Sequence, residues 1–140
     1  MATSLADRLF SQRPKLAGIE GKAILVVEDQ VLTAMDLADV IIDEGGWVVG
    51  PATTVTQAKR MIERLDVDGA ILDINLPDGT IAAVADLLSE QGVPFIIYSG
   101  DSDVSDFCKR WPQAAICRKP SSAESVVNRL AICTKSSMVA

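Results

Sequence analysis

From Ala23 onward, five short apolar runs alternate with longer segments of helical period. A short run without polar alternation is typical of a strand that is buried on both faces. Strands that alternate with helices pair in parallel, because each helix returns the chain to the start of the next strand. We therefore predict an α/β fold with a doubly wound, five-stranded parallel sheet and helices on both faces. The strands are expected at residues 23–28, 47–50, 69–73, 94–98 and 114–118.

The segments that follow the first two runs carry apolar stripes together with start and stop signals of helices. A first helix is expected to end at Gly45-Gly46, a pair that suits a helix C-terminus. Its apolar face is expected to contain Val31, Ala34, Met35, Ala38, Ile41 and Ile42. A second helix is expected to begin at Thr54, with Gln57 completing a capping box. Its apolar face is expected to contain Val55, Ala58, Ile62 and Leu65.

Three further helices are expected in the second half of the chain. The third carries Ile81, Ala85 and Leu88 and stops before Gly92 and Pro94. The fourth has a core-packing stripe and ends at Pro112, and the stripe is Val104, Phe107, Cys108 and Trp111. The fifth opens with the capping-box pattern Ser121-Ser122-Ala123-Glu124 and continues through Val127, Leu130 and Ala131. We expect both tryptophans, Trp47 and Trp111, to be core or half-buried packing residues.

A chain of 140 residues is the usual size of one domain. We place the domain at residues 22–133, between an N-terminal arm (1–21) and a C-terminal tail (134–140). The arm is interpreted as either a flexible segment or a docking helix, and its apolar stripe is Ala2, Leu5, Ala6 and Leu9. No apolar run approaches the roughly 20 residues of a membrane span, and the first residues lack the apolar core of a secretory signal. We therefore expect a cytoplasmic protein with no membrane partner.

The rarer residue types exclude several classes of site. The three cysteines form no C-x-x-C pair and the chain has no histidine, so a thiolate or imidazole metal site is not expected. The absence of histidine also removes the commonest general base and excludes a phosphohistidine on this chain. The net charge is −6 and the lysines and arginines do not cluster, which argues against a nucleic-acid surface. Proteins or small cations are the expected partners.

Charged and hydroxyl side chains follow four of the five expected strands. Glu28 and Asp29 end the first, Asp73 the third, Ser99 the fourth and Lys119 the fifth. The carboxyl ends of parallel strands share one edge of the sheet, so these side chains are expected to converge. Three carboxylates form a hard-oxygen site that suits Mg²⁺, which would also relieve their mutual repulsion. An aspartate beside Mg²⁺ and a lysine ammonium is a competent nucleophile for a phosphoryl group, and the product would be an acyl phosphate.

This set of residues resembles that of response-regulator receiver domains of bacterial two-component systems. The resemblance rests on Glu28-Asp29, "DINLPDG" at 73–79, Ser99 and Lys119-Pro120, and it extends over residues 22–133. The stretch "GVPFIIYSG" at 92–100 is similar to stand-alone receivers of alphaproteobacteria, which often have "PFxFATG" there. The resemblance implies a (βα)5 flavodoxin-like receiver fold.

The resemblance also implies a role for each site residue. Asp73 would accept the phosphoryl group from a phosphohistidine on a sensor kinase or phosphotransfer protein. Mg²⁺ would be held by Glu28, Asp29, the Asp73 carboxylate and the backbone carbonyl of Asn75.

Three other residues complete the implied site. Lys119 would pair with Asp73 and then with the phosphoryl oxygens, and Pro120 would follow a cis peptide bond. Ser99 would turn inward to hydrogen-bond the phosphoryl group and pull the adjoining loop with it.

Three features depart from the family pattern. Ile116 stands where the family usually has an aromatic switch residue, so output through ring rotation is not available at that position. Tyr98 is a weaker candidate for that role, because strand alternation points it to the opposite face from Ser99. The loop after Asp73 is short, with Gly79 six residues beyond it, which leaves its backbone geometry open. No effector domain follows residue 133, so direct DNA binding is not expected.

The sequence therefore predicts a single-domain response regulator that switches protein–protein interactions, as a relay, a phosphate sink or a docking switch. A phosphorylation-independent scaffold is the alternative, favoured by Ile116 and the short loop. An aspartate-nucleophile phosphatase of the haloacid-dehalogenase type is disfavoured, because its general acid would stand at Asn75, which cannot donate and retrieve a proton.

Overall fold

The computed structural model describes residues 18–100 and 105–138, with side chains described as far as Thr134. Five strands form one parallel sheet in the order β2-β1-β3-β6-β7. They are β1 (Ala23–Val27), β2 (Trp47–Ala52), β3 (Gly69–Leu72), β6 (Phe95–Ser99) and β7 (Ala115–Arg118). The predicted doubly wound parallel sheet is confirmed, with strand ends within two residues of the expected ones.

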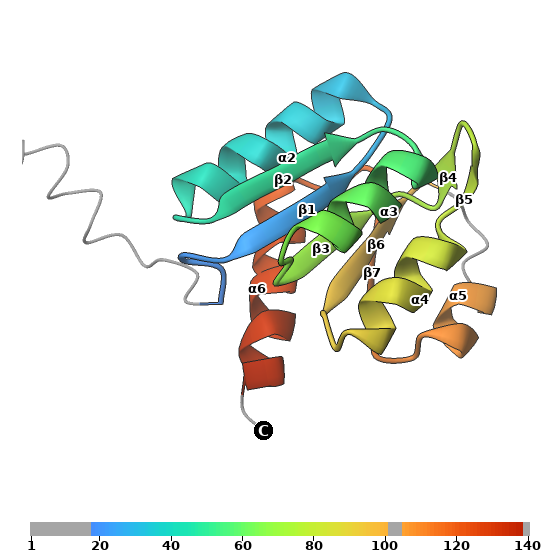
Figure 1. The fold of residues 1–140 in the computed structure, drawn as a ribbon. Helices are drawn as coiled ribbons and strands as arrows, with labels where there is room; N and C mark the ends of the chain where they lie inside the picture. The colour runs from blue at the N-terminus through green and yellow to red at the C-terminus, as the bar shows by residue number, and fades with distance from the viewer. Residues whose placement is uncertain (1–17, 101–104, 139–140) are drawn as a thin grey trace, which may run out of the picture.

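Helices cover both faces of the sheet (Figure 1). One face is packed by α2 (Val31–Asp43) and α6 (Ala123–Met138). The other face is packed by α3 (Val55–Arg64), α4 (Ala82–Glu90) and α5 (Ser105–Arg110). Successive residues of β1 alternate between the two cores, as strand geometry requires: Ile24 and Val26 face α2 and α6, whereas Leu25 and Val27 face α3 and α4.

The first helix ends as its glycines predict, but its buried face differs from the expected one. The amides of Gly45 and Gly46 bond to the carbonyls of Ile42 and Ile41, the pattern of a Schellman cap with Gly45 at φ +87°. The buried residues of α2 are Ala34, Leu37 and Ile41, while the exposed apolar residues of the predicted stripe are Val31, Met35 and Ile42. Two overlapping apolar stripes run along this helix, and contact with α6 selects the one that contains Leu37.

Of the two helix starts that were predicted from capping boxes, the one at Thr54 is correct in place and the one at Ser121 is one residue too early. Thr54 accepts a hydrogen bond from the Gln57 amide, while the Gln57 side chain bonds to Thr53 rather than to Thr54. At α6 the cap is Ser122, whose hydroxyl accepts the Ser125 amide, so the expected box beginning at Ser121 is wrong by one residue. Leu65 has left the helix in an extended conformation, which explains why it is exposed.

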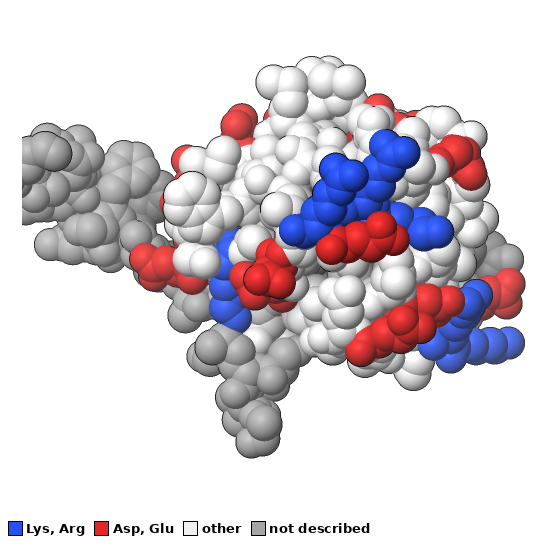
Figure 2. Space-filling model, viewed as in Figure 1, with Lys and Arg blue, Asp and Glu red and all other residues white. Residues whose placement is uncertain are grey.

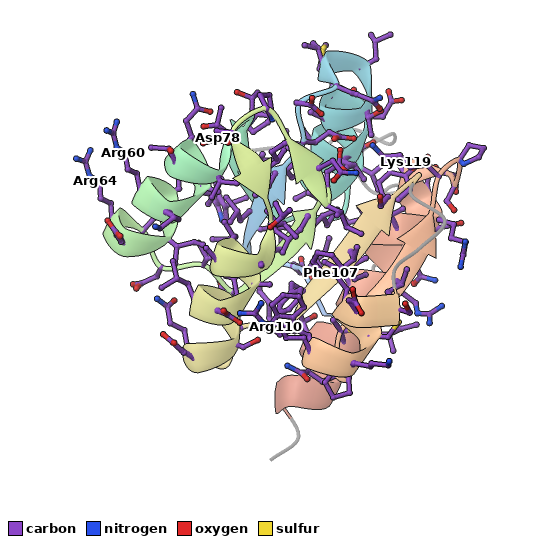
Figure 3. The ribbon with its side chains drawn as sticks, turned by 90° about the vertical axis from the view of Figure 1, so that its right-hand side faces the viewer. Arg60, Arg64, Asp78, Phe107, Arg110 and Lys119 are labelled. Carbon is purple, nitrogen blue, oxygen red and sulfur yellow. The ribbon has the colours of Figure 1, made fainter. Side chains whose placement is uncertain are left out.

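The two tryptophans have opposite environments. Trp111 is buried and its indole nitrogen donates to Asp86 across the gap between α5 and α4, so its prediction is confirmed. The side chain of Asp86 also bonds to Arg110, which lies beside Phe107 in Figure 3. Trp47 is 70% exposed and the prediction of a packed residue is wrong there, because β2 is the edge strand of the sheet. Cys108, expected on the core stripe of α5, is exposed, and Val104 lies outside the described residues.

The first described residues contact the core and helix α6. Ile19 is fully buried in the core beneath α2 and α6, although the arm was expected to extend to residue 21. The hydroxyl of Thr134 is buried and donates to the carbonyl of Gly18 over 2.7 Å. Helix α6 continues to Met138, beyond the expected start of the tail at residue 134. The stripe expected at residues 2–9 lies outside the described residues.

No described helix has the length and apolarity that crossing a bilayer requires. Charged side chains instead lie on the outer faces of the helices, and lysines and arginines gather over α3 in Figure 2, next to carboxylates. Among them, Arg60 and Arg64 extend away from the body of the protein in Figure 3.

Candidate functional site

The three predicted carboxylates meet at the carboxyl edge of the sheet. Glu28 and Asp29 directly follow β1, and Asp73 directly follows β3, the neighbouring strand. The pairing of Val27 with Leu72 sets these strands in register, so that both chains leave the sheet at the same level. Each of the three residues has a carboxylate oxygen within 4.8 Å of the others. The expected convergence of the strand ends is therefore confirmed for this acidic group.

Lys119 directly follows β7, and its side chain extends to the acidic group. Its ammonium lies 2.5 Å from Glu28 Oε1, 3.3 Å from Gln30 Oε1 and 3.4 Å from Asp73 Oδ2. Figure 3 shows Lys119 at this end of the sheet, near the start of α2. Its contact with Glu28 is thus closer than the contact with Asp73 that the resemblance implies. The bond between Lys119 and Pro120 is cis, as predicted.

Ser99 lies at the same edge, between the acidic group and Lys119. It is the last residue of β6 and is 2% exposed. Its carbonyl accepts the backbone amide of Lys119 over 2.9 Å, which ties the end of β6 to the residue that follows β7. The hydroxyl and the ammonium are therefore placed by neighbouring strands of the sheet.

Glu28 is an unusual carboxyl group because it is 2% exposed. The pKa of Glu28 is raised from 4.5 to about 7: burial contributes most, hydrogen bonding to Asp73 and its charge add to the rise, and Lys119 opposes it. Burial by itself would lower the pKa of Lys119, but its hydrogen bond and attraction to Glu28, and then to Asp73, raise it overall. The ionised form of this buried carboxyl group is therefore unfavourable, and a further positive charge at the site would stabilise it.

The donor set fits a hard divalent cation such as Mg²⁺. All candidate ligands are oxygens, and Glu28 Oε2 is buried without a hydrogen bond from any described residue. A buried carboxylate oxygen without a donor is costly, and a cation would satisfy it. Mg²⁺ takes a few carboxylates and keeps several waters, which matches an exposed Asp29 at the rim. Asn75, the fourth implied ligand, begins the short strand that follows Asp73.

The short loop after Asp73 folds into a two-stranded hairpin that the sequence analysis did not anticipate. Its strands are β4 (Asn75–Leu76) and β5 (Gly79–Thr80), paired antiparallel around Pro77 and Asp78. Gly79 has φ +141°, a value that a residue with a side chain rarely adopts. The open question about this backbone is thereby answered, because the glycine makes a tight turn possible.

Asp78, at the tip of this hairpin, reaches the first turn of α3. Its carboxylate accepts the Val55 amide over 2.7 Å and bonds to both the amide and the hydroxyl of Thr56. These bonds, that of Val55 first, hold the pKa of Asp78 below its ordinary value. Figure 3 shows Asp78 at this end of α3. Asp78 thus attaches the hairpin that follows Asp73 to the first turn of α3.

Two residues of this edge were missed or undervalued by sequence reasoning. Gln30 stands at the N-cap position of α2, and its side-chain oxygen accepts a hydrogen bond from Lys119; its only signal in the sequence was its place directly after Glu28-Asp29. Tyr98 is buried on the face that α2 and α6 cover, with the ammonium of Lys119 5.4 Å from its ring centroid. Ile116, at the position expected for an aromatic switch, is half-buried against the opposite core.

Comparison with known proteins identifies the family. The response regulator receiver domain family matches residues 24–130. The phyllosphere-induced regulator PhyR of Methylorubrum extorquens is 40% identical over 85 residues, which are 59% of this chain and 32% of that protein. The transcriptional regulatory protein PdtaR of Mycobacterium tuberculosis is 31% identical over 83 residues, covering 58% of this chain and 40% of that protein. The matched segment spans less than half the length of either relative.

A solved structure agrees with this result at the level of the fold. A response regulator receiver protein from Sinorhizobium medicae superposes with a TM-score of 0.76 at 20% identity, over 84% of this chain and 98% of that one. The strand order, the acidic edge and the family match lead to one conclusion: the chain belongs to the response regulator receiver domain family of two-component systems.

Proposed function

We propose that this chain accepts a phosphoryl group on Asp73 from a phosphohistidine and thereby changes its affinity for a downstream protein. The observation that carries the proposal is the carboxylate of Asp73 within 4.8 Å of those of Glu28 and Asp29, with Lys119 on its other side. Asp73 is only 12% exposed at its side chain, which limits competition from water while leaving an oxygen accessible. The donor would be a histidine kinase or a phosphotransfer protein, because this chain has no histidine.

Beyond the nucleophilic oxygen of Asp73, the transfer needs mainly positioning and charge stabilisation from the protein. An Asp73 oxygen forms the new O–P bond while the P–N bond to the donor imidazole breaks, and the electron pair of that bond stays on the nitrogen. Lys119 balances negative charge on the phosphoryl oxygens as they approach Asp73. Glu28, Asp29, Asp73 and the carbonyl of Asn75 would hold Mg²⁺, which when bound supplies positive charge against the same oxygens.

Ser99 is the residue that would couple phosphorylation of Asp73 to a conformational change at the surface. Its hydroxyl belongs to a buried residue at the end of β6, so a shift toward the phosphoryl group would move residue 100 with it. Since Ile116 cannot act by ring rotation, the change would reach partners through the end of β6. A protein target is favoured over DNA by the net charge of −6. A cytoplasmic location is part of the same proposal.

A phosphorylation-independent scaffold is the second candidate. It is favoured by one observation, the close pairing of Lys119 with Glu28, which holds the site together by internal bonds alone. A hydrolytic enzyme is not proposed, because Asn75 stands where an aspartate-nucleophile phosphatase needs its general acid.

The deciding experiment is intact-protein mass spectrometry after incubation with acetyl phosphate and Mg²⁺. Wild type is expected to gain one phosphoryl group, and Asp73→Asn is expected to gain none. Asp36→Asn is the matched control, because it removes an exposed carboxylate of α2 that lies outside the acidic group. Omitting Mg²⁺ should abolish the gain. A folded wild type that gains no phosphoryl group under these conditions would favour the scaffold, and turnover of p-nitrophenyl phosphate would revive the phosphatase.

A further inference from the structure

Tyr98 is the one tyrosine of the chain and lies next to Ser99 near the end of β6. It is 7% exposed and packs in the core that α2 and α6 cover. A phenylalanine would offer the same ring to this apolar position, and three neighbours along β6 are aliphatic or aromatic hydrocarbons. The hydroxyl group is therefore the feature that needs an explanation.

The hydroxyl bonds to the backbone that follows Lys119. It donates to the carbonyl of Ser121 over 2.8 Å and accepts the amide of Ser121 over 3.2 Å. Both bonds end on a single peptide segment two residues after Lys119, and neither uses a side chain of that segment. The hydroxyl thus fixes the position of the chain where it leaves β7 for α6.

The ring of the same tyrosine lies beside the ammonium of Lys119. Nζ is 5.4 Å from the ring centroid, within the range of a cation–π contact. The ammonium also donates hydrogen bonds to Glu28 and Asp73. The ring restricts the position of Nζ and does not compete for the carboxylate oxygens, because its contact with the ammonium is not a hydrogen bond to them. The backbone amide of Lys119 is held separately by the carbonyl of Ser99.

We propose that Tyr98 is a positioning residue for Lys119: its hydroxyl fixes the segment after β7 and its ring confines the ammonium that faces Asp73. The functional part of this inference rests on the proposed phosphoryl transfer. A lysine that stabilises charge on transferring oxygens acts best when it is held in place beforehand, because reorganisation during the reaction lowers the rate. The hydroxyl of Tyr98 bonds to Ser121 and its ring lies beside Lys119, so Tyr98 would act on the transfer through Lys119.

The first test is Tyr98→Phe, which keeps the ring and removes both bonds to Ser121. The rate of phosphorylation is measured by intact mass over a range of acetyl phosphate concentrations with saturating Mg²⁺. We expect the maximal rate to fall on the order of tenfold, with the half-saturating concentration of acetyl phosphate little changed. Ser122→Ala is the matched control, because it removes the cap of α6 in the same segment and should keep the wild-type rate. Circular dichroism identifies a temperature at which every variant is folded.

The second test asks whether the effect passes through Lys119. In a Lys119→Met background, Tyr98→Phe is expected to cause no further loss of rate, because the group that it positions is gone. A general loosening of the fold would instead lower the rate by the same factor in both backgrounds. The ring signals of this single tyrosine, read by ¹³C NMR after tyrosine labelling, should shift in Lys119→Met and stay in place in Ser122→Ala.

The outcomes separate this inference from the proposed function. If wild type is never phosphorylated, the proposed function fails, and the tyrosine signals still decide whether Lys119 lies against the ring. If wild type is phosphorylated and Tyr98→Phe matches its rate, the positioning role is wrong while the function stands. Equal losses in the two Lys119 backgrounds would also overturn the inference.

Discussion

The ammonium of Lys119 donates to Glu28 with 2.5 Å between Nζ and Oε1, which makes a partly buried ion pair at the acidic edge. Glu28 is also the carboxylate best placed to hold a cation, because its second oxygen is buried and accepts no hydrogen bond from the residues that the structure describes. Lys119 and a metal ion therefore attract the same carboxylate. Their positive charges also repel each other across a partly buried site, where charge interactions are stronger than in water.

This relationship predicts that Lys119→Met raises the affinity for Mg²⁺ by about three- to tenfold, because one positive charge near the site is removed. Isothermal titration calorimetry at constant ionic strength measures the change. Arg118→Met is the matched control, since it removes an equal charge from the adjacent, exposed position. Unchanged or weaker binding in Lys119→Met would show that the lysine does not compete with the metal.

Removal of the carboxylates should have the opposite effect. Asp29→Ala is expected to weaken Mg²⁺ binding about tenfold or more, and the Asp29→Ala, Asp73→Ala double variant to abolish it, because Mg²⁺ here depends on few protein ligands. Asp36→Ala, an exposed carboxylate of α2 outside the acidic group, serves as the control. Retention of wild-type affinity by the double variant would place the metal elsewhere.

The link between Asp78 and α3 predicts a stability that depends on pH. The native fold lowers the pKa of Asp78, so the unfolded chain takes up its proton first as the pH falls. The carboxylate therefore stabilises the fold fully above its ordinary pKa of 3.8, and the contribution is lost as the pH falls through the lower native value. Asp78→Asn should have a lower thermal midpoint than wild type at neutral pH, and the gap should close in acid.

Thermal unfolding followed by circular dichroism between neutral pH and the acid limit of the native state measures this gap. Asp36→Asn is the control and should follow wild type at every pH. A constant gap between Asp78→Asn and wild type across the range would mean that the ionised carboxylate is not the stabilising group.

The burial of Ile19 predicts that the folded domain begins before residue 22. Ile19→Ala should lower the free energy of unfolding by about 2–5 kcal/mol, because it deletes a fully buried side chain from the core under α6. Ile132→Ala, at a position that is 55% exposed, should change it by less than about 0.5 kcal/mol. Urea denaturation of both variants gives the comparison. If both variants changed the free energy of unfolding equally and only slightly, residue 19 would belong to the arm and not to the folded domain.

The sequence by itself determined the strands, the helix starts and the set of residues at the carboxyl edge. These features are local: a continuous apolar run such as residues 24–27 can only be buried on both sides, and Gly45-Gly46 can end a helix whatever surrounds it. The placement of Glu28, Asp29 and Asp73 together follows from the parallel topology, which fixes the ends of all strands at one edge.

Only the tertiary structure decided which partners these residues have. Trp47 is exposed because β2 is an edge strand, and α2 buries Leu37 because α6 lies on that side, and both facts depend on strand order. The pairing of Lys119 with Glu28, and the contact of Tyr98 with the segment after it, join residues far apart in the chain. Such contacts depend on distances set by packing, which no local pattern of residues encodes.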